Sequence, residues 1–179
     1  LESQHILSND LLLNARLSRV WWWQSNEGRT ERGRTEPLFI DAEIGRWSGG
    51  APDDMHNRST VTTAGLTASR MAGHHLVKGG LEFKDNSLSV VSVGGYVERF
   101  SSTFFSRFVF DADLGVSNRI LSGFVQDSWR LGSRLRANVG VRWDGQFFVS
   151  SEGKVAQTIL DQWQPRLGLA WMPGGTGQH

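Results

Sequence analysis

The feature that most constrains this chain is an unbroken alternation of apolar and polar side chains at residues 135–144. Arginine, asparagine, glycine and aspartate occupy the even positions, and the odd positions are Leu135, Ala137, Val139, Val141 and Trp143. A period of two over this length is typical of a β-strand with one apolar face, because successive side chains point to opposite faces. An amphipathic helix would show a period near 3.6 instead.

A second strand, at residues 119–131, precedes this one. The intervening Gly132–Arg134 suits a three-residue hairpin loop, and a loop of this length sets the register. The predicted opposing pairs are Leu131 with Leu135, Trp129 with Ala137, and Val125 with Val141. Asp127 then falls on the apolar face as its one charged residue, so the position of Asp127 tests the register.

Similar patterns along the chain predict about eight strands. They lie at residues 11–23, 58–71, 75–86, 88–99, 103–110, 119–131, 135–149 and 162–172. Residues 24–57 are rich in charges of both signs, which favours a long solvated loop, with a short strand or helix at 38–47.

The connections between these strands have an uneven distribution. Short turns at Gly73, at Gly132 and at 173–175 would share one end of an antiparallel sheet. The longer connections at 24–57, 111–118 and 150–161 would share the other end, where the short link at 86–88 is the exception. Short turns on one side and long loops on the other are typical of outer-membrane barrels. Three consecutive tryptophans, Trp21–Trp23, resemble an interfacial aromatic belt.

Composition narrows the class of protein. The chain has 21 glycines, eight tryptophans and ten phenylalanines, which suit strands and aromatic girdles. It contains no apolar run near the roughly 20 residues of a membrane helix, but barrel strands leave only a weak hydropathy signal. The absence of cysteine excludes disulfides and thiolate metal sites, and a net charge of +1 gives no case for a nucleic-acid partner. We therefore predict an all-β fold, an antiparallel up-and-down transmembrane β-barrel segment.

No catalytic motif is present, and we expect neither an enzyme nor a bound cofactor. His74 and His75 are adjacent in a strand and point to opposite faces, so we expect no metal site there. Arg29, Arg32 and Arg34 are interpreted as part of a solvated loop rather than as an anion site, since glutamates are interspersed among them.

Three segments resemble one known family, the TonB-dependent outer-membrane receptors. The stretch GFVQDSWRL (123–131), followed by RLRANVGVRWD (134–144), resembles the barrel signature of these receptors, particularly of the class with an N-terminal carboxypeptidase-regulatory-like domain. GHHLVKGGLEF (73–83) and WQPRLGLAWMP (163–173) resemble further strands of the same barrel, in family order.

The resemblance implies that residues 1–179 are an internal part of a 22-stranded barrel, with 24–57 as an extracellular loop. The chain begins at Leu1, and we expect no signal peptide and no plug within it. TonB would be reached only through missing N-terminal parts. The expected location is the outer membrane of a Gram-negative-type bacterium, the expected partner is outer-membrane lipid, and the transported ligand is an unknown small molecule of the siderophore, oligosaccharide or peptide class.

The resemblance also implies roles for the two faces. Expected to face the lumen or plug are Lys78, Glu82, Lys84, Arg136, Asn138, Arg142 and Arg166. Expected to face lipid are Val77, Leu81, Phe83, Leu135, Val139, Val141, Trp143, Leu167 and Leu169. Two alternatives stay open from the residues alone: a passive porin-type barrel, and a soluble β-sandwich that binds glycans through exposed tryptophans.

Overall fold

A computed structural model of the chain describes residues 1–51 and 53–173, and for Asp53 the backbone only. These residues form nine strands and one short helix, which confirms the all-β prediction. In chain order the elements are β1 (Glu2–Ser8), β2 (Leu11–Asn26), α1 (Glu31–Thr35), β3 (Leu38–Asp41), β4 (Arg46–Gly49), β5 (Asp53–Ala72), β6 (His75–Arg99), β7 (Phe105–Leu131), β8 (Leu135–Val149) and β9 (Val155–Trp171). No helix among the described residues has the length and apolar character to cross a membrane.

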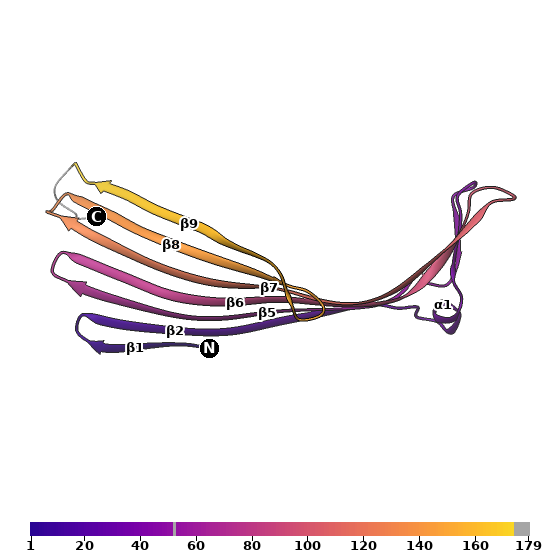
Figure 1. Cartoon of the computed structure of the whole chain (residues 1–179), viewed down its shortest axis with the longest axis horizontal. Coiled ribbons are helices and arrows are strands. Elements are labelled where there is room, and N and C mark those ends of the chain that lie inside the picture. Colours follow the sequence, from indigo (N-terminus) through magenta and orange to yellow (C-terminus); the bar gives the residue numbers. More distant parts are fainter. Residues whose placement is uncertain (52, 174–179) are drawn as a thin grey trace. The chain divides into compact units, whose positions relative to one another are not determined.

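The chain divides into two compact units. Unit 1 comprises residues 1–20, 61–86 and the chain from residue 117 onward, and unit 2 comprises residues 21–60 and 87–116. In unit 1, seven strands lie side by side in the order β1-β2-β5-β6-β7-β8-β9, so that each strand neighbours the next long strand of the chain (Figure 1). This arrangement is the predicted up-and-down topology.

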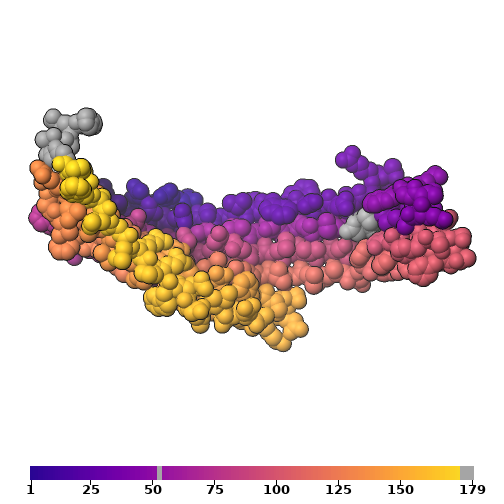
Figure 2. Space-filling view, turned by 90° about the horizontal axis from the view of Figure 1, so that it is seen from above, coloured from indigo at the N-terminus to yellow at the C-terminus, as the bar shows by residue number. Residues whose placement is uncertain are grey.

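Unit 1 is a single layer. Only two hydrophobic residues of the whole described chain are buried, Leu38 and Val149, and large apolar side chains are exposed along every long strand. β9 ends the strand order and lies exposed along one edge (Figure 2). The sheet therefore has no core of its own among the described residues, and its apolar face needs another apolar medium or layer to cover it.

The predicted breaks in two strands are wrong. Residues 75–86 and 88–99 form the single strand β6, and residues 103–110 and 119–131 belong mostly to the single strand β7, with no loop at 111–118. Aspartate, asparagine and glycine at these points were interpreted as turn residues. However, alternation continues through 112–116, and every described residue with positive φ is a glycine elsewhere in the chain. Without such a residue, the backbone stays extended.

Other boundaries also differ from the prediction. Residues 2–8 form β1, which was not predicted, and β9 begins at Val155, so the loop after β8 is shorter than 150–161. The predicted loop at 24–57 is interrupted by α1 and by the β3–β4 hairpin, which occupies the segment expected to be a short strand or helix.

The revised connections keep only part of the predicted asymmetry. At one end the chain turns at Asn9–Asp10, Gly73–His74 and Gly132–Arg134, where Gly73 and Gly132 adopt positive φ. At the other end the connections span 27–52, 100–104 and 150–154, so only the first is long. The exceptional link at 86–88 disappears because β6 is continuous. Of the predicted turn at 173–175, only Pro173 is among the described residues.

The register predicted for the β7–β8 hairpin is confirmed. Leu131 pairs with Leu135, Trp129 with Ala137, and Val125 with Val141. Asp127 pairs with Val139, which places this carboxylate on the apolar face as expected.

Candidate functional site

The two faces of unit 1 differ in chemistry. Residues that oppose each other in an antiparallel pair share a face. Between β8 and β9 the apolar pairs are Leu135 with Trp171, Ala137 with Leu169, Val139 with Leu167, Val141 with Pro165, and Trp143 with Trp163. On the other face Asn138 opposes Gly168, Gly140 opposes Arg166, and Arg142 opposes Gln164. The polar and apolar sets predicted in these strands therefore occupy opposite faces.

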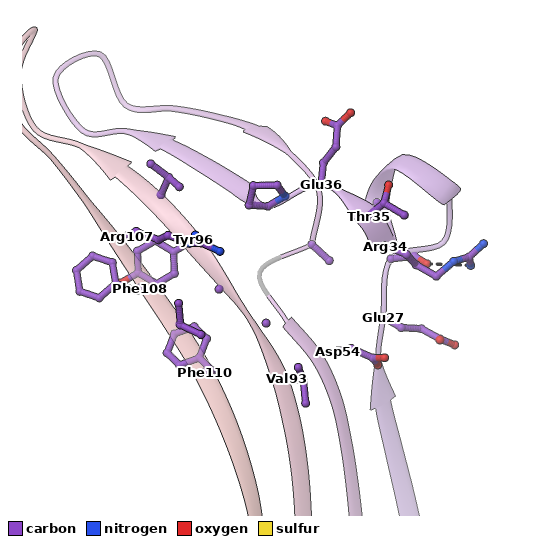
Figure 3. A pocket seen from close by; sticks show the side chains of 18 of the residues that line it. Glu27, Arg34, Thr35, Glu36, Asp54, Val93, Tyr96, Arg107, Phe108 and Phe110 are labelled. Atoms are coloured by element: carbon purple, nitrogen blue, oxygen red, sulfur yellow. Dashed lines mark hydrogen bonds between the residues drawn. The ribbon is translucent and has the colours of Figure 1, made fainter.

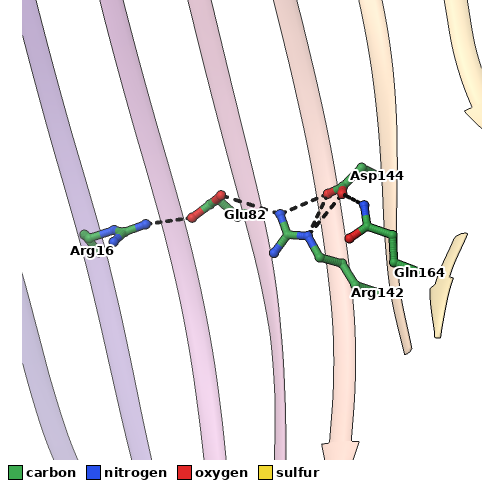
Figure 4. A network of polar contacts seen from close by, with 5 residues as sticks. All are labelled: Arg16, Glu82, Arg142, Asp144 and Gln164. Carbon is green, nitrogen blue, oxygen red and sulfur yellow. Dashed lines mark hydrogen bonds and ion pairs between the residues drawn. The ribbon is translucent and has the colours of Figure 1, made fainter. Parts of the chain in front are cut away.

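An ion-pair network crosses the polar face (Figure 4). Arg16 on β2 donates to Glu82 on β6 at 2.6 Å, and the other Glu82 oxygen lies 3.8 Å from Arg142 on β8. Arg142 donates to Asp144 from two nitrogens, each 2.9 Å from Oδ1, and Gln164 on β9 donates to Asp144 at 2.7 Å. Positive and negative groups alternate across the sheet, so the network is neutral overall and each charge has a partner.

A polar hollow of about 320 Å³ lies beside this network in unit 1. Lys78, one of the predicted polar-face residues, lines it together with Arg16, Glu82 and Arg142. The lack of a side chain at Gly80 leaves room for the Phe124 ring, because a Cβ on Gly80 would lie 2.7 Å from that ring. The hollow therefore combines charged groups with one aromatic ring.

The other predicted polar-face residues lie apart from this network. Asn138 accepts a hydrogen bond from Ser128 at 2.6 Å. Arg136 lines a small hollow with His74 and Arg130, and Arg166 lines another beside Gly140. Lys84 follows Glu82 by two positions along β6 and shares its face by alternation.

Asp127 has a partner on the apolar face. Its Oδ2 lies 2.6 Å from His75 Nδ1, and the His75 ring stacks on Trp129 with centroids 5.2 Å apart. The other oxygen, Oδ1, is buried without a hydrogen-bond partner among the described residues. His75 and Asp127 thus contact one another on the apolar face beside an aromatic ring, at the end of the sheet where β6 begins, and Asp85 and Arg119, 3.6 Å apart, form a second polar pair on the same face.

Unit 2 contains a pocket of about 450 Å³ (Figure 3). One wall carries Tyr96, Phe108 and Phe110, and the Tyr96 and Phe108 rings stack with centroids 4.5 Å apart. The opposite wall comes from the segment around α1 and includes Glu27, Arg34 and Glu36. The pocket joins an aromatic surface to charged groups, a combination suited to binding a ligand rather than to bond-making chemistry.

The arginines near α1 are engaged locally. Arg32 pairs with Glu36 at 2.7 Å, and Arg34 donates to the carbonyl of Gly28 at 3.2 Å. Thr30 caps the helix by accepting a hydrogen bond from the Gly33 amide. The contact of Arg32 fits the interpretation of a solvated loop, whereas Arg34 also lines the pocket.

Strand β3 is fastened to β6 by a parallel pairing, from Leu38 with Tyr96 to Asp41 with Arg99. Arg99 donates to Glu43 at 2.9 Å and lies 3.5 Å from Asp41. The hydrogen bond to Glu43, aided by the charge of Asp41, raises the pKa of Arg99 above its usual value. Arg99 therefore adds side-chain contacts to the backbone pairing that attaches β3 to the C-terminal end of β6.

No group of three or more histidine, cysteine, aspartate or glutamate side chains able to hold a metal ion occurs in the part of the chain that the structure describes.

Comparison with known proteins identifies the family. The domain family described as "TonB dependent receptor-like, beta-barrel" matches residues 3–176. The chain belongs to this family. Its members are transport proteins of the Gram-negative outer membrane, not a class of enzymes. A similar segment occurs in the TonB-dependent transporter Oar of Myxococcus xanthus, which is 36% identical over 58 residues. That segment covers 32% of this chain and 6% of the Oar protein. No solved structure matches the chain.

Several residues of these sites were not singled out from sequence. Arg16, Asp144 and Gln164 occupy polar positions of alternating strands, but only the pairing of β2, β6, β8 and β9 brings them together. Tyr96 fell in the predicted strand 88–99, and Phe108 and Phe110 fell in the predicted strand 103–110, but none of the three was singled out. The continuing alternation of residues 108–116 was the signal that could have revealed them.

Proposed function

We propose that this chain is part of the barrel of an outer-membrane transporter that imports a scarce ligand with energy passed on through TonB. The observation that carries the proposal is the chemical difference between the two faces of unit 1. One face is almost continuously apolar, while the other holds a neutral network of four charged side chains. In a barrel that spans a membrane, the apolar face meets lipid and the polar face lines the interior.

The His75–Asp127 pair supports this orientation. A lone carboxylate on a lipid face would be costly, but a carboxylate paired with histidine near the membrane surface is tolerated. His75 is the first residue of β6, next to the turn at Gly73–His74, and it stacks on Trp129. Tryptophan is enriched at membrane interfaces. We infer that this end of the sheet lies at the periplasmic interface.

Strand lengths support a role for unit 2 outside the membrane. A tilted barrel strand crosses the bilayer with about 9–11 residues, whereas β6 has 25 residues and β7 has 27. More than half of each strand is therefore in excess of the membrane. We infer that residues 87–116 and the insertion 27–52 stand on the extracellular side, where the pocket of Tyr96 and Phe108 is open to ligand.

The alternatives are less well supported. A soluble sandwich would cover its apolar face with a second sheet, and the described residues of unit 1 form one layer. A passive porin would have no plug, and the family match favours the energised transporter.

Single-cysteine labelling tests the proposal, since the chain itself has no cysteine. The neighbours Val139→Cys and Asn138→Cys are matched variants of the full-length protein in outer-membrane vesicles. With a fluorophore attached, residue 139 is expected to be quenched by nitroxides in the lipid tails, and residue 138 is not. Equal quenching at both positions, or full-length protein found only in the soluble fraction, would contradict the proposed function.

A further inference from the structure

The outer half of β7 has a free edge. β8 pairs with β7 only from Ser117, which opposes Val149, the last residue of β8. Residues Phe105–Val116 therefore have β6 on one side and no neighbouring strand on the other, within the described part of the chain. An unpaired edge of twelve residues is a template for another strand.

The backbone groups on this edge can be assigned. The register between β6 and β7 is constant: Leu81 contacts Gly123, Asp85 pairs with Arg119, and Tyr96 stacks on Phe108. The Arg130 amide donates to His74 on the β6 side, whereas the Val125 carbonyl points to Gly140 on the β8 side. Even-numbered residues of β7 therefore bond to β6, because a strand alternates the direction of its polar groups. Residues 105, 107, 109, 111, 113 and 115 present their N–H and C=O groups to the free edge.

The side chains along this edge do not protect it from pairing. Natural edge strands are often blocked by charged side chains, lysine above all, by proline or by bulges. Residues 105–116 contain neither lysine nor proline, and their charged side chains, Arg107, Asp111 and Asp113, are all odd-numbered and share one face. Apolar side chains alternate on one face, at Phe108, Phe110, Leu114 and Val116. On the other face Asp111 and Asp113 form no ion pair among the described residues.

The β6–β7 hairpin has a second edge, on β6, and the pairing of that edge shows which kind of strand can bind there. Beyond the start of β5, residues 96–99 of β6 are paired by β3, a strand supplied by the chain's own insertion. Arg99 adds ion pairs to the acidic side chains of that insertion. One edge of the hairpin is thus already extended by a strand that carries complementary charge, while the edge of β7 is not.

We propose that the β7 edge, residues 105–116, binds an extended polypeptide segment in which apolar and basic residues alternate. The inference rests on the proposed function, because it takes this edge to be extracellular, and it narrows the ligand to a polypeptide. Backbone donors and acceptors that recur every second residue, about 7 Å apart, match another strand and match neither a sugar nor a metal chelate. Apolar side chains of the segment would pack beside Phe108 and Phe110, and basic ones would pair with Asp111 and Asp113.

A second copy of the chain is a less complete match than a basic segment. Its edge offers one basic side chain, Arg107, against two aspartates, so a two-fold antiparallel pairing can set Arg107 opposite only one of them. The other aspartate would stay without a basic partner.

The test uses the full-length protein in outer-membrane vesicles and a fluorescent peptide of about ten residues in which valine and lysine alternate. Saturable binding is expected. The matched control peptide has the same side chains with alternate backbone amides methylated, which removes the donors needed for pairing, and it is expected not to bind. Equal binding of both peptides, or binding of neither, would overturn the proposal.

Substitutions locate the site. Val109→Pro removes an outward N–H and leaves the bonds to β6 intact, so peptide binding is expected to weaken about tenfold or more. The double variant of Asp111→Asn and Asp113→Asn is expected to weaken binding two- to tenfold, and less at high salt, as for exposed cross-strand charge pairs. Unchanged affinity in Val109→Pro would overturn the proposal.

The variant Val109→Cys distinguishes a bound peptide from a second copy of the chain and from another loop of the same protein. Crosslinking to a bound peptide with a cysteine at its centre supports the inference. Crosslinking instead to a second copy, or to another loop of the same protein in the absence of peptide, overturns it. The labelling difference between positions 138 and 139 is measured on the same vesicles. Its loss would mean that the proposed function has failed, whereas an intact difference without peptide binding rejects this inference alone.

Discussion

Units 1 and 2 share strands but place their apolar side chains differently. Most large apolar residues of β7 are odd-numbered in unit 1 and even-numbered in unit 2. In unit 1 Leu121, Val125, Trp129 and Leu131 are odd, against Ile120 and Phe124; in unit 2 Phe108, Phe110, Leu114 and Val116 are even, against Phe105 and Val109. The constant register between β6 and β7 excludes a net bulge as the cause. The register of backbone pairing is therefore the same in both units. What differs is the medium, lipid or water, that each face is proposed to contact.

This comparison also explains why the sequence was harder to interpret in unit 2. A change in the parity of apolar residues looks like a break between strands when only side-chain periodicity is considered. The stretch Asp111–Asn118 combines that change with residues that favour turns, and it was predicted as a loop. In the structure the main-chain ladder with β6 continues through it.

The largest expected effect is a difference between two positions on β7. Val125 lies in unit 1 and Val109 in unit 2, both odd-numbered and both more than half exposed in the isolated sheet. Val125→Arg is expected to lower the free energy of unfolding by about 2–4 kcal/mol, as for arginine near the middle of a membrane. Val109→Arg is expected to change it by about 0.5 kcal/mol or less, as on a water-facing surface. The measurement is denaturant unfolding of the full-length barrel in lipid vesicles.

The control for this comparison is Gln126→Arg, on the polar face next to Val125. It is expected to behave like Val109→Arg. If all three arginines cost the same, the apolar face of unit 1 does not contact lipid.

A smaller loss is expected from the polar face of unit 1. Arg142 donates to Asp144 and lies near Glu82, and its side chain is only 25% exposed. Arg142→Met removes charge-assisted hydrogen bonds and leaves two carboxylates facing each other, which is expected to cost about 1.5–3 kcal/mol. Removing Glu82 and Asp144 as well, by Glu82→Gln and Asp144→Asn, is expected to recover part of the loss. An additive result in the combined variant would show that the network is not coupled.

On the apolar face, the loss of the His75–Asp127 pair is expected to be smaller still. His75→Leu removes the partner of Asp127, and a penalty of about 1–2 kcal/mol is expected, since the carboxylate keeps some access to solvent. Adding Asp127→Val replaces both members of the pair by apolar residues and is expected to return the stability to within about 0.5 kcal/mol of the original. The same unfolding measurement applies. A double variant as unstable as the single one would mean that the pair has a structural role beyond the hydrogen bond between His75 and Asp127.

Much of unit 1 was predictable from sequence because one physical rule dominates there. Each strand has one apolar face, so alternation determines the faces, and the turns at Gly73 and Gly132 determine the registers. The register of the β7–β8 hairpin and the unusual place of Asp127 followed directly. The partner of Asp127 did not follow, because His75 is 52 residues away in the sequence and meets it only through the pairing of β6 with β7.

Unit 2 was less predictable because its contacts are set by tertiary pairing. Strand β3 runs parallel to β6, and a parallel pair has no turn that fixes its register from sequence. Arg99 was not singled out, since a single arginine at a strand end has no pattern of its own. Its partners, Asp41 and Glu43, lie in a segment for which either a short strand or a helix had been expected.

The smallest expected effect concerns the attachment of β3 to β6, and it tests whether a change in unit 2 leaves unit 1 unaffected. Arg99→Met removes the ion pairs with Asp41 and Glu43 and leaves the backbone pairing of β3 with β6 in place. Because Arg99 and Glu43 are about half exposed to water and Asp41 is partly exposed, global stability is expected to stay within error of the original. The amides of residues 38–41 are expected to exchange with deuterium severalfold faster, because local opening of β3 becomes easier. Arg99→Lys keeps the charge and is expected to restore most of the protection. Amides of β8 in unit 1 are the internal reference, and faster exchange there as well would show that the attachment of β3 is coupled to the barrel strands and is not a local feature of unit 2.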